Sequence, residues 1–427
     1  EPDRKVPWQL TLDVPSDVGA FSNTPIVRES ALDAKHKRVE FAQTLPLPSY
    51  LVAFAVGSFD VVDAGKTRHD VPLRFIAPRG GAKDASKWTP WIRQIIATYE
   101  DWFDIPYPYP KLDIVAVPRF GLGGMENAGL ITIEETALQE ATLGVVKHEI
   151  AHQWFGDLVT HAWWDDVWLT EKMASWMAGR VSKTFDSIED RDLVEQSAQA
   201  LHDLARRSHP IRVPIATSRT LDAIDEMYDY NGDIFSLFES YLGGDTFRHA
   251  LQIYLKRHAH GTATAQDFAA ALSEASGQAL DASFMALVEK GAVAHLGLGL
   301  SCASGHRVMV AHLSDTSWPL PMCFAYDHDG KRDEHCEVIE PTTTSVELPS
   351  TGCPKWFLPG VGGVSLAETT VAQNDTNALL GPGWEHLTQA ERRGLFITLR
   401  DELEIVTAVR RIVDGGDAAS MRLAARS

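Results

Sequence analysis

The stretch that most constrains this chain runs from His148 to Glu171 and reads HEIAHQWFGDLVTHAWWDDVWLTE. His148 and His152 are four residues apart, so on one helix their rings project from the same face. Apolar residues recur around them at helical spacing: Leu143, Val146, Ile150 and Trp154. The pattern therefore predicts a helix that presents two imidazoles to a single cation.

Two glutamates complete the groups that a catalytic zinc site needs, which are three protein ligands, an open position for water and a base. Glu171 follows His152 after eighteen residues, inside a second helical stretch from Thr170 to Phe185. A loop between the two helices can bring its carboxylate to the histidines as the third ligand. Glu149 lies about 100° round the helix from His148, where it can accept a proton from bound water. We expect one zinc ion per chain, although the bare five-residue pattern also occurs by chance on surface helices.

A second stretch strengthens the interpretation by resemblance. HEIAHQWFGDLV followed by WW-x-D-x-W-L-x-E is similar to the zinc aminopeptidases of the aminopeptidase N type, which are gluzincins. The upstream sequence GGMENAGLITI, from Gly123 to Ile133, resembles the Gly-x-Met-Glu-Asn signature of the same family. The resemblance implies a metallo-aminopeptidase that removes the first residue from peptides with a free N-terminus by means of metal-activated water.

The GGMEN stretch is expected to bind the substrate. Its paired glycines, Gly123 and Gly124, allow a backbone to come close to an extended peptide, which can add to the strand edge through main-chain hydrogen bonds. By resemblance, Glu126 pairs with the α-ammonium group of the peptide, between Met125 and Asn127 of the same motif. The alternative is that Glu126 is a turn residue exposed to water.

A tyrosine beyond the zinc signature is expected to stabilise the oxyanion. In the family, this tyrosine lies thirteen residues before the tyrosine of a Tyr-Leu-Gly sequence, and counting back from Tyr241 reaches Tyr228. The sequence departs from the family pattern here, because Tyr230-Asn231 stands where Lys-Gly is usual. Tyr230 is therefore a rival for the role, and either tyrosine can instead be a core aromatic residue.

The four cysteines all lie between residues 302 and 353. Asp329-Gly330 is a good two-residue hairpin turn, and counting outward from it pairs Cys323 with Cys336 at a position whose short Cα separation accepts a disulfide. Cys302 to Cys353 is the second predicted bridge. Two bridges favour an extracytoplasmic location, periplasmic or secreted. Four buried thiols in a cytoplasmic protein, or a structural zinc site, are the competing interpretations.

The 427 residues are too many for one core and predict a multidomain α+β protein. Residues 1–61 are strand-like, with a long apolar strand predicted from Ser49 to Phe59, and resemble part of a β-rich N-terminal domain. Residues 62–290 resemble a thermolysin-like catalytic domain. Residues 291–372 indicate a small β-sandwich, and residues 373–427 resemble the start of a helical C-terminal domain that is cut short.

Charge and hydropathy exclude two kinds of partner. The net charge of −19, without a basic patch, argues against nucleic acid. No apolar run approaches the eighteen residues that a membrane span needs. The sequence does not define the oligomeric state.

Other functions fit the same motifs. An endopeptidase and an epoxide hydrolase are alternatives on the same scaffold, and a catalytically silent peptide-binding homologue is the alternative outside catalysis. The complete set of base, ligands and tyrosine argues against the last of these.

Overall fold

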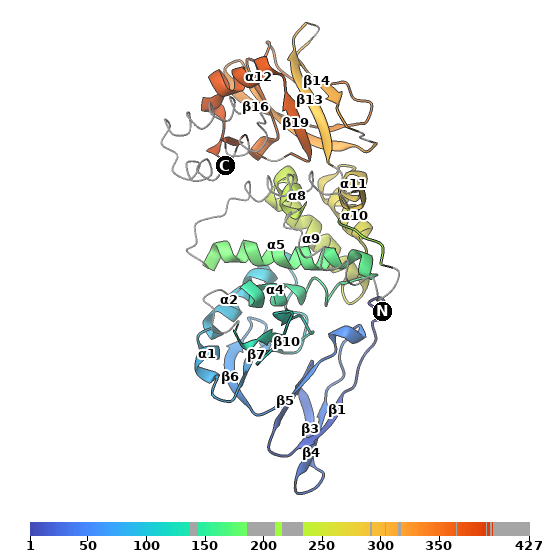
Figure 1. Cartoon of the computed structure of the whole chain (residues 1–427), viewed down its shortest axis with the longest axis vertical. Coiled ribbons are helices and arrows are strands. Elements are labelled where there is room, and N and C mark those ends of the chain that lie inside the picture. The colour runs from blue at the N-terminus through green and yellow to red at the C-terminus, as the bar shows by residue number, and fades with distance from the viewer. Residues whose placement is uncertain are drawn as a thin grey trace. The chain divides into compact units, whose positions relative to one another are not determined.

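The structure is a computed structural model that describes residues 1–136, 144–185, 210–215, 234–290, 293–303, 305–314, 317–363, 365–389, 391–392 and 395 (Figure 1). The chain divides into two compact units whose segments alternate along the sequence. Unit 1 comprises Glu1–Glu189, Pro214–Ala216 and Arg248–Ala271. Unit 2 comprises Asp190–Val213, Thr217–Phe247 and Leu272–Ser427. The domain boundaries expected after residues 61, 290 and 372 stay predictions.

The N-terminal part of unit 1 consists of short antiparallel strands, which confirms the predicted β-rich character. One sheet has the order β1-β4-β3, and β2 pairs with β5 in a second ladder. The strands are β1 (Thr11–Pro15), β2 (Gly19–Ser22), β3 (Ile26–Ala31), β4 (His36–Phe41) and β5 (Phe54–Gly57). The first sheet buries a small core of Val14, Ala20, Val39 and Phe41.

The long strand predicted from Ser49 to Phe59 is wrong. Residues Ser49–Leu51 form a 3₁₀ turn, and only Phe54–Gly57 pair as a strand before the next strand begins at Phe59. The Asn23 side chain donates a hydrogen bond to the carbonyl of Leu51 and accepts one from the amide of Ala53. These backbone groups are therefore satisfied by a side chain and do not join a strand ladder.

The second part of unit 1 is built on a five-stranded sheet of order β6-β7-β8-β10-β9. Its strands are β6 (Phe59–Lys66), β7 (Pro72–Pro78), β8 (Leu112–Val117), β10 (Leu130–Glu134) and β9 (Gly124–Met125). The three central strands, β7, β8 and β10, are parallel, and β8 is buried along most of its length. Within the described chain, β9 is an edge strand, paired antiparallel with β10 on one side only.

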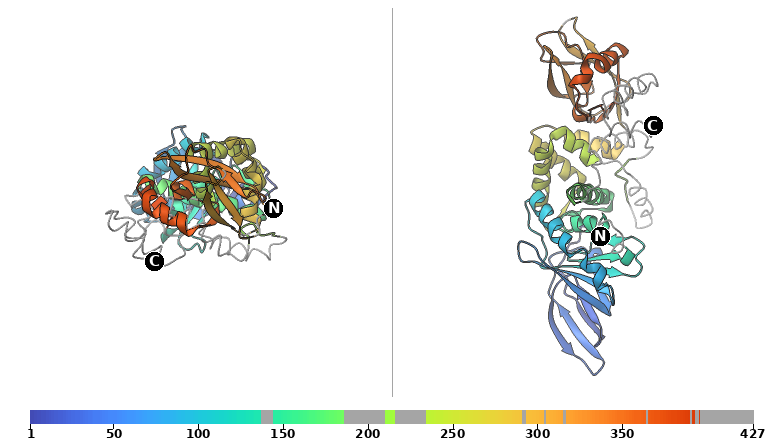
Figure 2. Two further views of the ribbon diagram at one scale, coloured as in Figure 1. Left: turned by 90° about the horizontal axis from the view of Figure 1, so that it is seen from above. Right: turned by 90° about the vertical axis from the view of Figure 1, so that its left-hand side faces the viewer.

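Helices α1 (Ala82–Ser86), α2 (Thr89–Phe103) and α4 (Gly144–His152) contact this sheet, and α2 buries an apolar face. Helix α5 (Val167–Phe185) follows, and α4 and α5 carry the two halves of the predicted zinc signature. Helices α4 and α5 pack against each other, as the views in Figures 1 and 2 show. Aromatic rings fill the space between α2 and the end of α4: Tyr99, Phe103, Tyr107, Trp154 and Phe155.

A lysine near the start of the chain joins segments of unit 1 that are distant in sequence. The Lys5 ammonium donates to the carbonyl oxygens of Asp157, Leu158 and Gly261 at 2.8, 3.1 and 3.2 Å. Burial lowers the pKa of Lys5 to about 8, against the opposing attraction of Asp157. The turn after α4 is thereby tied to the N-terminal segment and to the residues that precede β12 (Thr262–Ala263).

Unit 2 contains the predicted β-sandwich. One sheet has the order β17-β14-β13-β19 and the other β16-β15-β18. The strands are β13 (Ala294–Ser301), β14 (Arg307–His312), β15 (Leu320–His328), β16 (Lys331–Ile339), β17 (Ser345–Glu347), β18 (Phe357–Pro359) and β19 (Ala367–Val371). Both sheets contribute to one apolar core that includes Leu296, Val308, Phe324 and Phe357. Gold to red-orange ribbons mark these strands in Figures 1 and 2.

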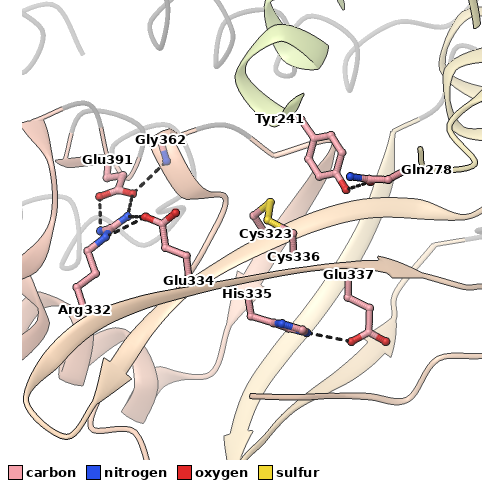
Figure 3. Close-up of a disulfide and its surroundings, with 10 residues drawn as sticks. All are labelled: Tyr241, Gln278, Cys323, Arg332, Glu334, His335, Cys336, Glu337, Gly362 and Glu391. Carbon is pink, nitrogen blue, oxygen red and sulfur yellow. Dashed lines mark hydrogen bonds and ion pairs between the residues drawn. A yellow bond between two sulfur atoms is a disulfide. The ribbon is translucent and has the colours of Figure 1, made fainter. Parts of the chain in front are cut away.

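Both predicted disulfides are confirmed. The hairpin of β15 and β16 turns at Asp329-Gly330 in the predicted register, which places Cys323 opposite Cys336. These two cysteines are bonded, as Figure 3 shows, and Cys302 is bonded to Cys353. The competing interpretations, free thiols and a structural zinc site on the cysteines, are therefore wrong.

Unit 2 contains helices as well as the sandwich. They are α8 (Ile234–Leu242), α9 (Gly244–His258, shared with unit 1), α10 (Ala265–Ser276, also shared), α11 (Asp281–Lys290) and α12 (Gln373–Ala378). Most of the predicted C-terminal helical segment, from residue 396 onward, lies outside the described residues. None of the helices that the structure describes combines the length and apolar character that a bilayer crossing requires.

Candidate metal centre and active site

The three predicted zinc ligands come together in unit 1. The Nε2 atoms of His148 and His152 are 2.9 Å apart. The Oε2 atom of Glu171 lies 3.3 Å from the first of these nitrogens and 3.5 Å from the second. One ligand atom from each residue fits within a group whose members all lie within 4.8 Å of one another. Two helical turns of α4 and the first turns of α5 thus converge on one point.

Further contacts hold the two imidazoles in orientation. The Nδ1 atom of the buried His152 is 2.8 Å from the carbonyl oxygen of Phe155, an acceptor to which this nitrogen donates its proton. The Nε2 lone pair of His152 therefore faces Glu171. The Nδ1 atom of His148 is 3.2 Å from Oγ of Ser175, which lies one helical turn beyond Glu171 in α5. Such contacts set the tautomer and the angle of metal-binding histidines.

The donor set fits zinc. Two neutral imidazole nitrogens and one carboxylate oxygen make the three-ligand set that a catalytic zinc ion takes. Burial lowers the pKa of His152, but Glu171 and two further glutamates outweigh burial and bring this pKa well above its usual value. Burial raises the pKa of Glu171, but His148 and His152 lower it more, so this pKa lies well below its usual value. The concentration of negative charge around His152 favours a divalent cation at this point.

The proposed base, Glu149, is buried beside the ligands. Removal from water raises the pKa of its carboxyl group well above the usual range, and Glu126 and Glu171 add to the rise. Strand β9 comes very close to it: a Cβ atom on Gly124 would lie 2.2 Å from Oε1 of Glu149. The backbone of the edge strand therefore passes directly against the base.

The GGMEN motif forms the edge of the sheet at the same site. Gly123 has a φ of +79°, a conformation that favours glycine, and it precedes β9, in which Met125 pairs with Thr132. Glu126 follows β9 and is half-buried; burial raises its pKa, while His152 lowers it and Glu171 raises it further. The carbonyl oxygen of Glu126 lies 2.7 Å from Nε2 of Gln153, the residue after His152, so the backbone of Glu126 is tied to the end of α4 that carries the ligands.

The side chain of Asn127 forms hydrogen bonds with neighbouring segments of unit 1. Its side-chain amide donates to the carbonyl oxygen of Tyr50 at 3.4 Å and accepts from the hydroxyl of Thr132 at the same distance. Its backbone carbonyl accepts from the amide of Leu130. The buried Asn127 thus fixes the turn that follows the motif, while the backbone of Gly124 and Met125 forms the strand.

Tyr228 and Tyr230, the two candidates for the oxyanion-stabilising residue, lie outside the described residues. Sequence reasoning missed three residues that hold the site: Ser175, Gln153 and Tyr107. Ser175 is four residues after Glu171, so the helical spacing that paired the histidines could have identified it. Gln153 and Tyr107 contact mainly backbone atoms of other segments, for which the sequence contains no comparable signal.

A helix that presents His148, Glu149 and His152 to a glutamate of the following helix is the arrangement of the gluzincin class. Residues 91–287 match the peptidase family M1 domain, and residues 1–51 match the peptidase M1 N-terminal domain. The chain therefore belongs to peptidase family M1.

Individual relatives agree with this assignment. The chain is 35 % identical to aminopeptidase M1-B of Oryza sativa subsp. japonica over 294 residues, which are 65 % of this chain and 33 % of the rice protein. It is 38 % identical to the puromycin-sensitive aminopeptidase of Caenorhabditis elegans over 297 residues, 65 % of this chain and 31 % of the relative. It is 32 % identical to the tricorn protease-interacting factor F2 of Thermoplasma volcanium over 348 residues, which are 75 % of this chain and 43 % of the relative. The chain spans about a third of the length of the first two.

Proposed function

We propose that this chain is the catalytic part of a zinc aminopeptidase, which hydrolyses the first peptide bond of substrates with a free N-terminus. One observation supports the proposal: the edge strand β9, which directly precedes Glu126, passes against the buried Glu149, the residue that follows His148 of the metal-binding group. A site with an ammonium anchor beside a hydrolytic centre selects the end of a chain.

His148, His152 and Glu171 are the residues that would hold the zinc ion. When bound, zinc supplies Lewis-acid polarisation of the scissile carbonyl and lowers the pKa of water. Glu149 accepts a proton from the attacking water and later delivers it to the leaving amine; its burial and raised pKa suit a group that must carry a proton between the two steps.

The remaining roles belong to substrate binding. The edge of β9 that has no strand partner within the described residues hydrogen-bonds to the extended peptide, and Gly123 and Gly124 add no side chain of their own there. Glu126 pairs with the α-ammonium group, which restricts cleavage to the first residue. Tyr228, or Tyr230 in its place, donates a hydrogen bond to the tetrahedral oxyanion.

A panel of aminoacyl-4-nitroanilides, each with an N-acetylated counterpart, tests the proposal on the purified chain with added zinc. We expect hydrolysis of the free amines only, its loss with chelator and its return with zinc. An equal rate on acetylated substrates would support the endopeptidase, and hydrolysis of an epoxide with none of the anilides would support the epoxide hydrolase. Zinc binding without any hydrolysis would support the silent peptide-binding homologue.

The disulfides support a location outside the cytoplasm, in the periplasm or the extracellular medium, because reducing compartments seldom maintain such bonds. Cells of the source organism treated with an alkylating agent before lysis give the test. We expect all four cysteines to escape alkylation; alkylation of Cys323 and Cys336 in the intact cell would contradict this location.

A further inference from the structure

Gln153 is a fully buried side chain that immediately follows the ligand His152. Its Nε2 atom donates to the carbonyl oxygen of Glu126 at 2.7 Å. Its Oε1 atom accepts from the backbone amide of Gly129 and from the hydroxyl of Tyr107, each at 2.9 Å. Both ends of the amide are therefore used, and the side chain connects the end of α4 to the segment that carries Glu126.

The Gly129 end of that segment is fixed from both sides. Its amide hydrogen-bonds to Gln153, and its carbonyl accepts from the buried ammonium of Lys111 at 2.7 Å. Gly129 has a φ of +70°, and a Cβ atom there would lie 2.6 Å from the carbonyl oxygen of Asn23. The turn from Glu126 to Gly129 consequently has little freedom to shift as long as Gln153 remains in place.

The Nε2 group of Gln153 contacts the residue proposed to bind the ammonium group, Glu126. The accepting carbonyl belongs to Glu126 itself, so the contact fixes the backbone from which the carboxylate projects. Since Gln153 and His152 are consecutive, one side chain sets the distance between the ammonium anchor and the metal ligands. A misplacement of about 1 Å at such a site can lower the rate roughly 100-fold.

We infer that Gln153 is a positioning residue that holds Glu126 in register with the metal ligands and so determines the preference for a free α-amine. The inference rests on the proposed aminopeptidase function. Gln153 does not touch the substrate; it acts through the backbone of Glu126. A purely structural role would lower stability and leave the choice between free and blocked amines unchanged.

Two variants and one matched control separate these roles. Gln153→Met keeps the volume of the side chain and removes both its hydrogen-bond donor and its acceptor. Gln153→Asn keeps the amide but is too short to make all three contacts. The second variant is used if the first fails to fold. Tyr107→Phe is the control, because it removes one hydrogen bond to Gln153 and leaves both backbone contacts of Gln153 intact.

The measurements are zinc content, thermal midpoint and the ratio of kcat/KM for a free aminoacyl anilide to that for its N-acetyl form. We expect both Gln153 variants to retain zinc and to lower the ratio 10-fold or more, chiefly by raising KM for the free amine. Binding of an amino-acid amide, measured by calorimetry in the Glu149→Gln background, should weaken in parallel. Tyr107→Phe should lower the midpoint and leave the ratio within about 2-fold.

Each unfavourable result has one meaning. A Gln153 variant with the wild-type ratio and a lower midpoint would overturn the positioning role. An equal drop of the ratio in Tyr107→Phe would overturn the assignment of the effect to the backbone contacts. A wild-type chain without any preference for the free amine would instead contradict the proposed function on which the inference rests.

Discussion

The catalytic region of unit 1 and the β-sandwich of unit 2 are held together by different means. Around the metal ligands, the fixed points are buried hydrogen bonds and charges: the Gln153 amide, the Lys111 ammonium and the carbonyl that orients His152. In the sandwich, both disulfides fasten the strands at positions where at least one sulfur lies near the surface. The four cysteines are all in unit 2.

The difference follows from what each region must do. A hydrolytic centre needs ionisable groups close together, and the burial of such groups costs free energy unless they have partners. The contacts that satisfy them then also fix the geometry of the site. A small sandwich has less chemistry to place and gains stability from covalent closure of its loops. Variants that remove either the buried polar contacts or the disulfides can therefore separate the two means of stabilisation.

The largest expected effect is a loss of activity that leaves the buried hydrogen bonds of unit 1 and the disulfides of unit 2 intact. Glu149→Gln keeps the shape of the side chain but removes the group that accepts the proton. We expect kcat to fall by about 10³-fold or more, with zinc content unchanged and the thermal midpoint equal or higher, because an uncompensated buried carboxyl group is removed. Glu385→Gln, at an exposed glutamate, is the control. A near-normal kcat would exclude Glu149 as the base.

Removal of a covalent link should act on the sandwich alone. The double variant Cys323→Ser, Cys336→Ser opens a link between residues thirteen apart, a closure worth about 3 kcal/mol. We expect amide exchange in Leu320–His328 to accelerate roughly 100-fold, while zinc content is unchanged. A reductant should have this effect on the wild type and none on the double variant at this hairpin. Loss of zinc from the variant would show that the two regions depend on each other.

Unit 2 also contains a buried ion pair, between Arg332 of the sandwich and Glu391 of the segment that follows it, so the two regions differ in degree. Glu391 is buried and accepts from both terminal nitrogens of Arg332 and from the amides of Gly362 and Thr388; Figure 3 shows the contacts with Arg332 and Gly362. Glu391→Gln should lower the local stability by about 1–3 kcal/mol, measured as denaturant midpoint against Glu385→Gln.

The pH dependence of this ion pair has a definite sign. Burial raises the pKa of Glu391, but the contacts with Arg332 and with the backbone amides of Thr388 and Gly362 together outweigh burial, so the folded-state pKa is below the usual value. The stabilisation is therefore present above the unfolded-state pKa of about 4.3 and is lost as the pH falls through the folded value. The variant should lack this acid-induced loss; an unchanged acid profile would contradict the assignment.

The last comparison concerns a buried cation in unit 1. Burial lowers the pKa of Lys111 to about 8, against the opposing effect of Asp113. Between pH 8 and the unfolded-state pKa of about 10.4, the unfolded chain binds more protons, so the free energy of unfolding rises with pH by up to about 1.4 kcal/mol per unit. Lys111→Met should lose this rise, and Lys83→Met, at an exposed lysine, should keep it.

Much of the fold was predictable because local spacing encodes it. Four-residue spacing placed both histidines on α4, and the turn at Asp329-Gly330 fixed the hairpin register and with it the pair Cys323–Cys336. The five-strand order and the pairing of β9 with β10 were not predicted, because they join segments through backbone hydrogen bonds that any sequence can make. The long strand from Ser49 failed for a related reason, since Asn23, distant in sequence, binds the backbone there.

The site shows the same limit. Its three candidate ligands came from motifs, and the structure brings them together, while the role of Glu149 as base stays a prediction. The Gln153 contacts were not predictable, because two of the three partners are main-chain atoms more than twenty residues away. Roles that depend on the substrate, such as that of Glu126, stay predictions, as does the choice between Tyr228 and Tyr230.

The hydrogen bonds of the Lys5 ammonium can form only after distant parts of the chain have been synthesised. Its three carbonyl partners lie 152, 153 and 256 residues further along the chain. The last of them emerges from the ribosome only when Gly261 has been made, well after both ligand helices. The segment around Lys5 must therefore wait until Gly261 has been made before it can close on the turn behind His152, and we expect a nascent chain that stops before Gly261 to leave this segment open to proteases.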